Sequence, residues 1–337
     1  MTDRTGLLAS GTLLVDYITV IDHFPAESSL ASILSESTTG GGGSFNILKD
    51  LSAMKVNFPL SICGLVGDDE NGKWLIDDCK QSHIDVSQLH VSNVAPTSYT
   101  YVMSVEKTGR RTFFNQRGTN ALLNENHFNF TKTNAKFFYL GYLTLLDQLD
   151  AFSSDDPTRT VASKLLECAL NSGLETIIDF VSASNTNYSK IAISSMPYVD
   201  HLILNETEAG FIVGRSLSDL KTIQYAAKEL LNYGVRKTVT IHFDDGAVTA
   251  VKNDDNLYVQ GSIILPDGFI KGAVGAGDAF AAGIIFGTHE QWSIKDRLRL
   301  AVCAAAACLN DSTPCAGVRT VAECLELEKF GYRTLEN

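Results

Sequence analysis

The stretch that decides the fold is Lys271-Gly272-Ala273-Val274-Gly275-Ala276-Gly277-Asp278-Ala279-Phe280-Ala281-Ala282-Gly283. Its small residues let the backbone turn tightly and leave peptide N–H groups uncovered. The apolar run from Ala279 to Phe286 then predicts a mostly buried helix. A glycine turn that leads into a helix is a site for an anion, because unpaired N–H groups and the helix dipole point at one place.

Asp278 places a carboxylate at this site, where it would repel a phosphate. One interpretation is that it caps the helix, a role that aspartate fills well. The other is that it takes a proton from a hydroxyl while that hydroxyl attacks a phosphoryl group. For an isolated Gly-x-Gly-Asp the cap is the more common case, so the rest of the chain has to decide.

A second glycine run, Gly40-Gly41-Gly42-Gly43, stands near the N-terminus. It is followed by apolar residues at helical spacing, Phe45, Leu48 and Leu51, which predict an amphipathic helix. Asn46 would lie in the first turn of that helix and face whatever the glycines approach. A flexible linker is the plain alternative, although linkers seldom lead straight into such a helix.

Two further polar positions follow predicted strands. The apolar run from Leu7 to Val15 predicts one buried strand that ends at Asp16. His201 to Leu204 predicts another strand, which is followed by Asn205 and Glu208. Ligands of open parallel sheets lie beyond the carboxyl ends of the strands, so these oxygen-bearing side chains are well placed. Asp16 could instead serve a turn. Asn205 and Glu208 fit a helix cap as well as a hydrated magnesium ion.

The chain from Val161 onward alternates predicted strands and helices, which is typical of a doubly wound parallel sheet in an α/β protein. Two earlier segments, residues 17–39 and 97–116, have the alternating, turn-broken pattern of a small β lid. We therefore expect a single domain over residues 1–337, with the lid formed by these two separate segments.

The composition of the 337 residues is that of an ordinary globular protein, 45% hydrophobic and 20% charged, with a net charge of -12. This acidity argues against a nucleic acid or an anionic membrane as partner. The seven cysteines are scattered without a Cys-x-x-Cys pair, which favours reduced thiols and a cytoplasmic protein. No apolar run reaches the length of a membrane helix.

Gly275-Ala276-Gly277-Asp278 and Gly41-Gly42 followed by Asn46 together resemble the two signatures of the PfkB (ribokinase-like) family of carbohydrate kinases. The resemblance implies a ribokinase-like fold and ATP-dependent transfer of the γ-phosphoryl group to a hydroxyl of a sugar or sugar-like substrate, with Mg²⁺ as cofactor. It leaves open a homodimer formed through the lid.

The resemblance also implies roles for single residues. Asp278 would be the catalytic base, and the turn of Gly275, Ala276 and Gly277 would receive the developing charge. Substrate binding would fall to Asp16, Gly41, Gly42 and Asn46. Asn205 and Glu208 would order the magnesium ion, and the nucleotide would contact Asn205, Gly246, Gly275 and Gly277.

The chain departs from the family pattern at three places. Gly272-Ala273 replaces the usual Asp-Thr, whose carboxylate helps to hold a monovalent cation in activated relatives. Residues 179–183 lack the Asn and Arg of Asp-x-Asn-x-Arg, and only Gly246 remains of Thr-x-Gly-x-x-Gly. A nucleoside kinase, with Phe113, Phe114 and Tyr142 as an aromatic slot, and a non-catalytic sugar-binding or regulatory protein are therefore the alternatives.

Overall fold

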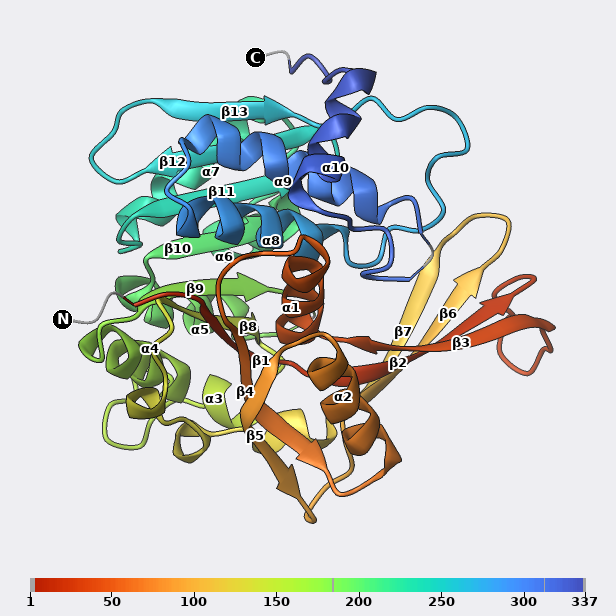
Figure 1. Cartoon of the computed structure of the whole chain (residues 1–337), viewed down its shortest axis with the longest axis horizontal. Coiled ribbons are helices and arrows are strands. Elements are labelled where there is room, and N and C mark those ends of the chain that lie inside the picture. The colour runs from red at the N-terminus through yellow and green to blue at the C-terminus, as the bar shows by residue number, and fades with distance from the viewer. Residues whose placement is uncertain (1–3, 184, 312, 336–337) are drawn as a thin grey trace.

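The computed structural model describes residues 4–183, 185–311 and 313–335. Within these residues the strands form two sheets, one of nine strands and one of four. The large sheet runs through the body of the molecule, and the small sheet extends from one side of it (Figure 1).

The large sheet has the order β13-β12-β11-β10-β9-β8-β1-β4-β5. Its strands from β11 to β5 pair in parallel, whereas β12 and β13 add an antiparallel edge. The strands are β1 (Leu7–Gly11), β4 (Leu60–Gly67), β5 (Asp85–Ser92), β8 (Phe137–Leu143), β9 (Glu175–Phe180), β10 (His201–Asn205), β11 (Thr238–Phe243), β12 (Gly246–Val251) and β13 (Leu257–Gly261).

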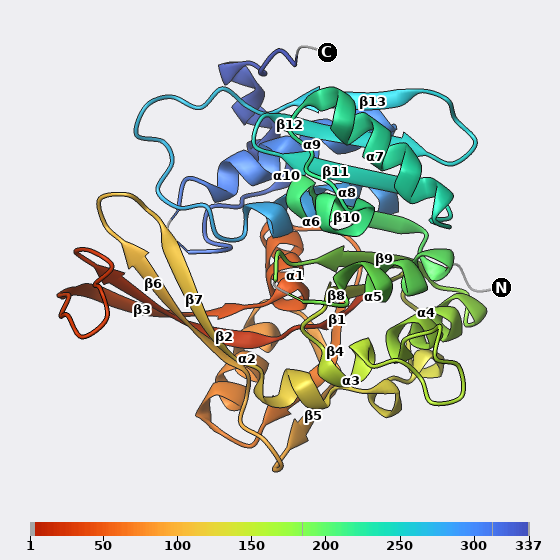
Figure 2. The same cartoon turned by 180° about the vertical axis from the view of Figure 1, so that it is seen from behind.

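Helices cover both faces of this sheet. Figure 1 shows one layer in front, and Figure 2 shows the other layer from behind. The front layer contains α1 (Gly43–Ala53), α2 (Glu70–Gln81), α8 (Ala276–His289), α9 (Ile294–Cys308) and α10 (Val321–Leu325). The layer behind contains α3 (Asp147–Asp150), α4 (Val161–Asn171), α5 (Tyr188–Ser195), α6 (Glu206–Val213) and α7 (Leu220–Asn232).

The central strands are mostly apolar because each face meets a helix layer. In β8, Phe137 and Tyr139 pack into the front core, whereas Phe138 and Leu140 pack into the core behind. The alternation has a period of two residues, as a strand requires. The predicted doubly wound, mostly parallel sheet is thereby confirmed.

The expected single strand from Leu7 to Val15 is wrong. The structure ends β1 at Gly11 and begins β2 (Leu14–Ile21) in the small sheet. Thr12 joins them, with its backbone N–H donating to the Gly141 carbonyl over 2.7 Å. Both segments are apolar and buried, so the change of sheet leaves no mark in the hydropathy. Asp16 consequently lies within β2 and does not follow a strand of the large sheet.

The small sheet has the order β3-β2-β6-β7 and is drawn from the segments expected to form a lid. Besides β2 it contains β3 (Ile33–Gly41), β6 (Tyr99–Val105) and β7 (Arg111–Gln116). Asp16 pairs with Thr100, which pairs with Asn115, so these three side chains share one face of the sheet. Tyr17, Tyr101 and Phe114 share the opposite face.

None of the described helices is both long and apolar enough to cross a membrane. All seven cysteines are free thiols, as their scatter along the sequence predicts.

Candidate active site

Polar residues from distant parts of the chain meet at the carboxyl edge of the large sheet. They line a cavity of about 700 Å³ that extends under the small sheet. Of the residues singled out from the sequence, the cavity walls include Asp16, Gly42, Asn46, Asn205, Glu208, Gly275, Gly277 and Asp278. The large sheet, the small sheet and α8 therefore each supply part of one site.

Asp278 lies in the first turn of α8, and it does not cap the helix. The N-cap is Gly275, whose φ of 83° is left-handed. A Cβ atom at position 275 would come within 2.2 Å of the Pro314 carbonyl oxygen, so the turn needs glycine for space as well. The capping interpretation of Asp278 is therefore wrong, and its carboxylate faces the cavity.

Two side chains hold the buried Asp278 carboxylate. The Tyr142 hydroxyl donates to Oδ1 over 2.5 Å, and the Asn46 amide donates to Oδ2 over 2.9 Å. Burial raises the pKa of Asp278 to about 6, while both hydrogen bonds act to lower it. The group is thus a base with a pKa close to neutrality, which suits proton transfer at physiological pH.

The peptide N–H groups of Ala276 and Gly277 lie in the first turn of α8, where a helix offers them no internal acceptor. Gly277 lines the cavity under the small sheet and also a second cavity of about 410 Å³. The two cavities therefore meet at the start of α8, beside the carboxylate of Asp278.

Asp16 reaches the first cavity from β2. It is almost fully buried, and burial raises its pKa to about 7, partly offset by a hydrogen bond with Thr100. A Cβ atom at Gly41 would lie 2.2 Å from the Asp16 carboxylate, so only glycine lets the end of β3 pass so close. Gly42, Asn46 and Asp16 line the cavity together, whereas Gly41 lies against the Asp16 side chain and is not among the lining residues.

Asn205 and Glu208 form a reciprocal cap at the start of α6. The Asn205 side chain accepts from the Glu208 N–H over 2.8 Å, and Glu208 accepts from the Asn205 N–H over 2.9 Å. Capping alone does not explain their burial against the cavity. Glu208 is 4% exposed, and burial raises its pKa to about 7. Both residues face the space beside Gly277.

The second cavity has the character of a nucleotide site. Its apolar walls come from the turn after β13, from α8 and from α9, with His242, Phe243 and Gly246 at the end of β11 and the start of β12. The charged residues Glu206, Asp244 and Arg333 also line it. The apolar lining residues are Ile263, Leu265, Ile270, Ala273, Ala276, Phe280, Val302, Ala305, Ala306 and Leu309. Flat apolar walls beside unpaired N–H groups suit a base linked to phosphates.

The sequence offered Tyr142 only for the aromatic slot of a nucleoside kinase, and it gave no role to several other lining residues of the first cavity, among them Asp179, His242 and Arg111. Tyr142 follows Gly141 at the end of β8, and Asp179 lies at the end of β9. Their positions at strand ends were a usable signal. His242 and Arg111 also line the cavity. No local sequence pattern identifies Arg111 as a site residue, because the direction of its side chain depends on the register of the small sheet.

The chain is similar to known carbohydrate kinases. The profile of the pfkB family carbohydrate kinases matches residues 5–320. A 5-dehydro-2-deoxygluconokinase of Clostridium botulinum is 27% identical over 301 residues, which cover 86% of this chain and 84% of that protein. Ribokinase of Arabidopsis thaliana is 23% identical over 333 residues, covering 96% and 81% respectively.

Solved structures show the same fold. Arabidopsis thaliana ribokinase complexed with ribose and ATP has a TM-score of 0.77 at 21% identity, covering 97% of this chain and 100% of that one. Giardia lamblia ribokinase has the same TM-score at 18% identity and the same coverage. The family match spans nearly all of the described fold and its cavities. The chain therefore belongs to the pfkB family of carbohydrate kinases, and it is an ATP-dependent phosphotransferase that acts on a sugar hydroxyl.

Proposed function

We propose that Asp278 is the catalytic base of this kinase and that the sugar binds in the cavity under the small sheet. The observation that carries the proposal is the place of its carboxylate, which lies where the two cavities meet. A hydroxyl in the first cavity and a γ-phosphoryl group entering from the second would approach each other there. The carboxylate accepts the proton as the hydroxyl attacks.

Other residues of the chain divide the remaining tasks. The N–H groups of Ala276 and Gly277 stabilise the charge that develops on the transferred group, because they are fixed in the first turn of α8. Asp16 and Asn46 bind substrate hydroxyls beside the backbone of Gly41 and Gly42. Gly275 fixes the shape of the turn.

Magnesium fits the charge of this site. Asp16, Asp179, Glu208 and Asp278 all face the first cavity, and burial raises the pKa of each. A triphosphate beside these acids needs a cation to offset repulsion. Among the residues that the structure describes, no three metal-ligating side chains are close enough to hold an ion alone. Asn205 and Glu208 would therefore hold the ion mostly through water, and it would offset the phosphate charge.

Arg111 favours an anionic sugar as the substrate. It lies on β7 with its side chain in the cavity wall, and burial lowers the pKa of its guanidinium. No carboxylate of the described chain lies within ion-pair distance of it. A half-buried cation without a counterion is unfavourable, so a carboxylate on the substrate would supply the partner. The relatives named 5-dehydro-2-deoxygluconokinase support a sugar acid.

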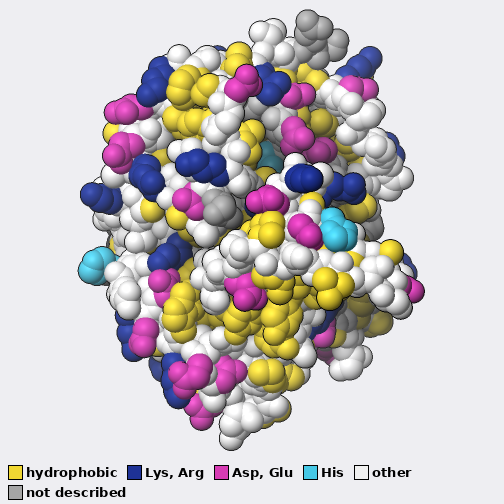
Figure 3. All heavy atoms as spheres, turned by 90° about the vertical axis from the view of Figure 1, so that its right-hand side faces the viewer, with side chains coloured by type: hydrophobic (Ala, Val, Ile, Leu, Met, Phe, Trp, Pro, Cys, Tyr) yellow, Lys and Arg dark blue, Asp and Glu magenta, His cyan; other side chains and the backbone are white. Residues whose placement is uncertain are grey.

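A homodimer through the small sheet also belongs to the proposal. Figure 3 looks at the side of the molecule from which this sheet extends, and it shows hydrophobic side chains gathered there. Large apolar residues of this sheet and of its loops that are mostly or half exposed are Phe24, Leu30, Ile33, Leu34, Tyr101, Phe113 and Phe114, and Phe113 also lines the first cavity. Apolar groups gathered in this way mark an interaction surface.

The catalytic role is tested by Asp278→Asn. Asparagine keeps the size of the side chain but does not accept the proton, so kcat should fall by about 10²–10⁴. Binding of ATP and sugar, measured by calorimetry, should change little. The matched control is Asp296→Asn in the first turn of α9, which should keep wild-type turnover.

The substrate panel for this test contains neutral sugars, sugar acids and nucleosides, with sugar-dependent ADP release as the readout. Turnover of nucleosides alone would replace the proposal with a nucleoside kinase. Sugar binding without ADP release for any substrate would mean that this chain binds without catalysis. A fully active Asp278→Asn variant would remove the base role.

The anionic substrate is tested by Arg111→Gln, with the exposed neighbour Arg110→Gln as control. Loss of the guanidinium should raise KM for a sugar acid by about tenfold or more and leave KM for ATP unchanged. The same variant should leave the KM of the corresponding neutral sugar nearly unaltered. Equal effects of the two variants would show that only the general charge of the lid matters.

A further inference from the structure

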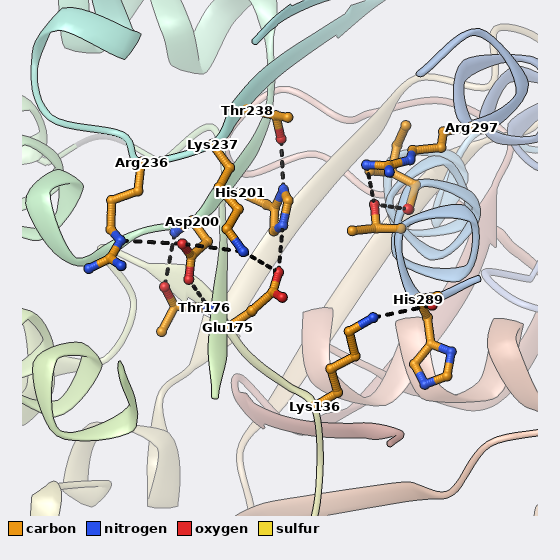
Figure 4. Close-up of polar contacts among 12 residues, drawn as sticks. Lys136, Glu175, Thr176, Asp200, His201, Arg236, Lys237, Thr238, His289 and Arg297 are labelled. Carbon is orange, nitrogen blue, oxygen red and sulfur yellow. Dashed lines mark hydrogen bonds and ion pairs between the residues drawn. The ribbon is translucent and has the colours of Figure 1, made fainter. Parts of the chain in front are cut away.

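A third cavity, which is polar, lies at the opposite edge of the large sheet. It has a volume of about 440 Å³ and lies at the amino ends of β9, β10 and β11, whose carboxyl ends reach the active site. Figure 4 shows polar side chains of these strands beside Lys136, with His289 of α8 and Arg297 of α9 on the other side. Its charged lining residues are Lys136, Glu175, Arg236, Lys237, Lys252 and Arg297.

Two of these basic residues are already paired. Lys237 lies 2.7 Å from Glu175, and Arg236 lies 3.3 Å from Asp200 (Figure 4). The buried His201 bridges Glu175 and Thr238, and burial lowers its pKa, so that its ring is neutral at pH 7. Glu175 and Asp200 therefore already have basic partners within the protein.

The other three basic residues have no acidic partner. Lys136 donates to the His289 carbonyl over 3.3 Å, and Arg297 donates to the Trp292 carbonyl over 2.8 Å and to the Thr288 hydroxyl over 3.3 Å. Over the ranges that the structure describes, no ion pair includes Lys136, Arg297 or Lys252. Burial lowers the pKa of the Arg297 guanidinium, and the charge of Glu175, which is itself paired with Lys237, offsets this effect only in part.

This concentration of positive charge stands out in a chain whose net charge is -12. Five basic side chains and one carboxylate line the cavity, so its lining carries an excess of positive charge. Cations that converge on a concave surface raise the local concentration of anions. Lysine and arginine side chains together are donors typical of phosphate sites.

We propose that this cavity binds a phosphate dianion, either as free phosphate or as the phosphate group of a small ester. Lys136, Lys252 and Arg297 supply the charge. Lys237 remains close to the same space while it is paired with Glu175. The site is separate from the ATP and sugar cavities, and it holds whether or not Asp278 is the catalytic base.

The test uses the full chain saturated with a non-hydrolysable ATP analogue, which blocks the ATP cavity, and the lysine variants then distinguish this cavity from the sugar cavity, whose Arg111 stays accessible. Calorimetric titration with inorganic phosphate, and separately with ribose 5-phosphate, should each reveal one further site. Lys136→Gln combined with Lys252→Gln should weaken that binding by about tenfold or more. Lys136→Arg with Lys252→Arg should retain it.

The control is Lys132→Gln combined with Lys190→Gln, two exposed lysines outside the cavity. Tighter binding of ribose 5-phosphate than of phosphate would identify an ester site, whereas equal affinities would identify a free-phosphate site. An equal loss in the control variant would overturn the proposal, because only net charge would then matter. Titrations that show no binding in the blocked wild-type chain would also overturn it.

Discussion

At Asp278, burial and hydrogen bonding act on one carboxyl group in opposite directions. Burial raises its pKa, the bonds from Tyr142 and Asn46 lower it, and the result is about 6. A base must be deprotonated to act, so kcat should fall as the pH drops through this value. Asp16 has its own raised pKa, of about 7, but as a proposed substrate ligand it should affect KM more than kcat.

Tyr142→Phe tests this balance. Without the phenol hydroxyl, one interaction that lowers the pKa of Asp278 is gone, so the acid limb of kcat should move to higher pH by about one unit. The measurement is kcat at saturating ATP and sugar between about pH 5 and pH 9. Tyr139→Phe is the control, since that hydroxyl contacts Asp179 over 3.4 Å and not Asp278. An acid limb that stays in place would show that Tyr142 does not tune the base.

The sequence predicted Asp278 and Asn46 correctly as neighbours of one site, because each lies in a short signature. It did not predict that Tyr142 would bind the same carboxylate. Tyr142 and Asp278 are 136 positions apart, and only the pairing of β8 with β1 and the packing of α8 bring them together. Contacts of this range are set by the tertiary fold and leave no local pattern.

At the scale of single elements, α1 carries an acid inside its apolar layer. The expected stripe of Phe45, Leu48 and Leu51 is buried, yet Asp50 on the same helix is also fully buried. Among the described residues its carboxylate oxygens have no N–H or O–H donor, and the Cys315 thiol is only a weak neighbour. Burial, and then the charge of Asp278, raises the pKa of Asp50 well above its usual value.

Asp50→Asn should alter how the stability of the protein depends on pH. The folded state keeps a proton on Asp50 that the unfolded state releases above about pH 4, so the wild type loses stability as the pH rises. Asparagine does not ionise and avoids this loss. The difference in unfolding free energy, variant minus wild type, should therefore increase from about pH 5 to pH 8 by about 1 kcal/mol or more.

Urea unfolding at the two pH values measures this difference. Asp77→Asn on α2 is the control, because its side chain is exposed and its difference should stay nearly constant. If Asp50→Asn also gave the same difference at both pH values, Asp50 would not be protonated in the folded protein.

Some elements followed from the sequence, and the exceptions share a physical reason. The expected strand from His201 to Leu204 lies within β10, and the expected helix from Ala279 to Phe286 lies within α8. The break between β1 and β2 and the antiparallel edge of β12 and β13 were not predicted. Hydropathy reports whether a segment is buried, whereas membership of a sheet depends on partners elsewhere in the chain.

At the scale of the whole molecule, the small sheet is where a second copy of the chain would bind. Tyr101 and Phe114 pair across β6 and β7 on the face that does not line the cavity, and both are about half exposed. Phe113, one residue away, lines the cavity instead. In the proposed dimer, one face of the sheet would meet the substrate and the opposite face would meet the partner copy.

Phe114→Ser should weaken the proposed dimer. Light scattering after gel filtration at several concentrations would measure it, with a shift towards the monomer mass in the variant. Phe211→Ser is the control, because that ring is 46% exposed but lies on α6, outside the small sheet. A wild-type chain that is monomeric at all concentrations would rule out the dimer.

The four acids that line the first cavity, Asp16, Asp179, Glu208 and Asp278, affect the energetics of ligand binding. Asp16 and Glu208, each with a pKa of about 7, are both partly protonated at neutral pH. A sugar hydroxyl that donates to Asp16, or a cation beside Glu208, favours the ionised form. If these residues have their proposed roles, binding of the sugar and of the cation should release protons to the medium, and the measured heat of these two steps should depend on the ionisation enthalpy of the buffer.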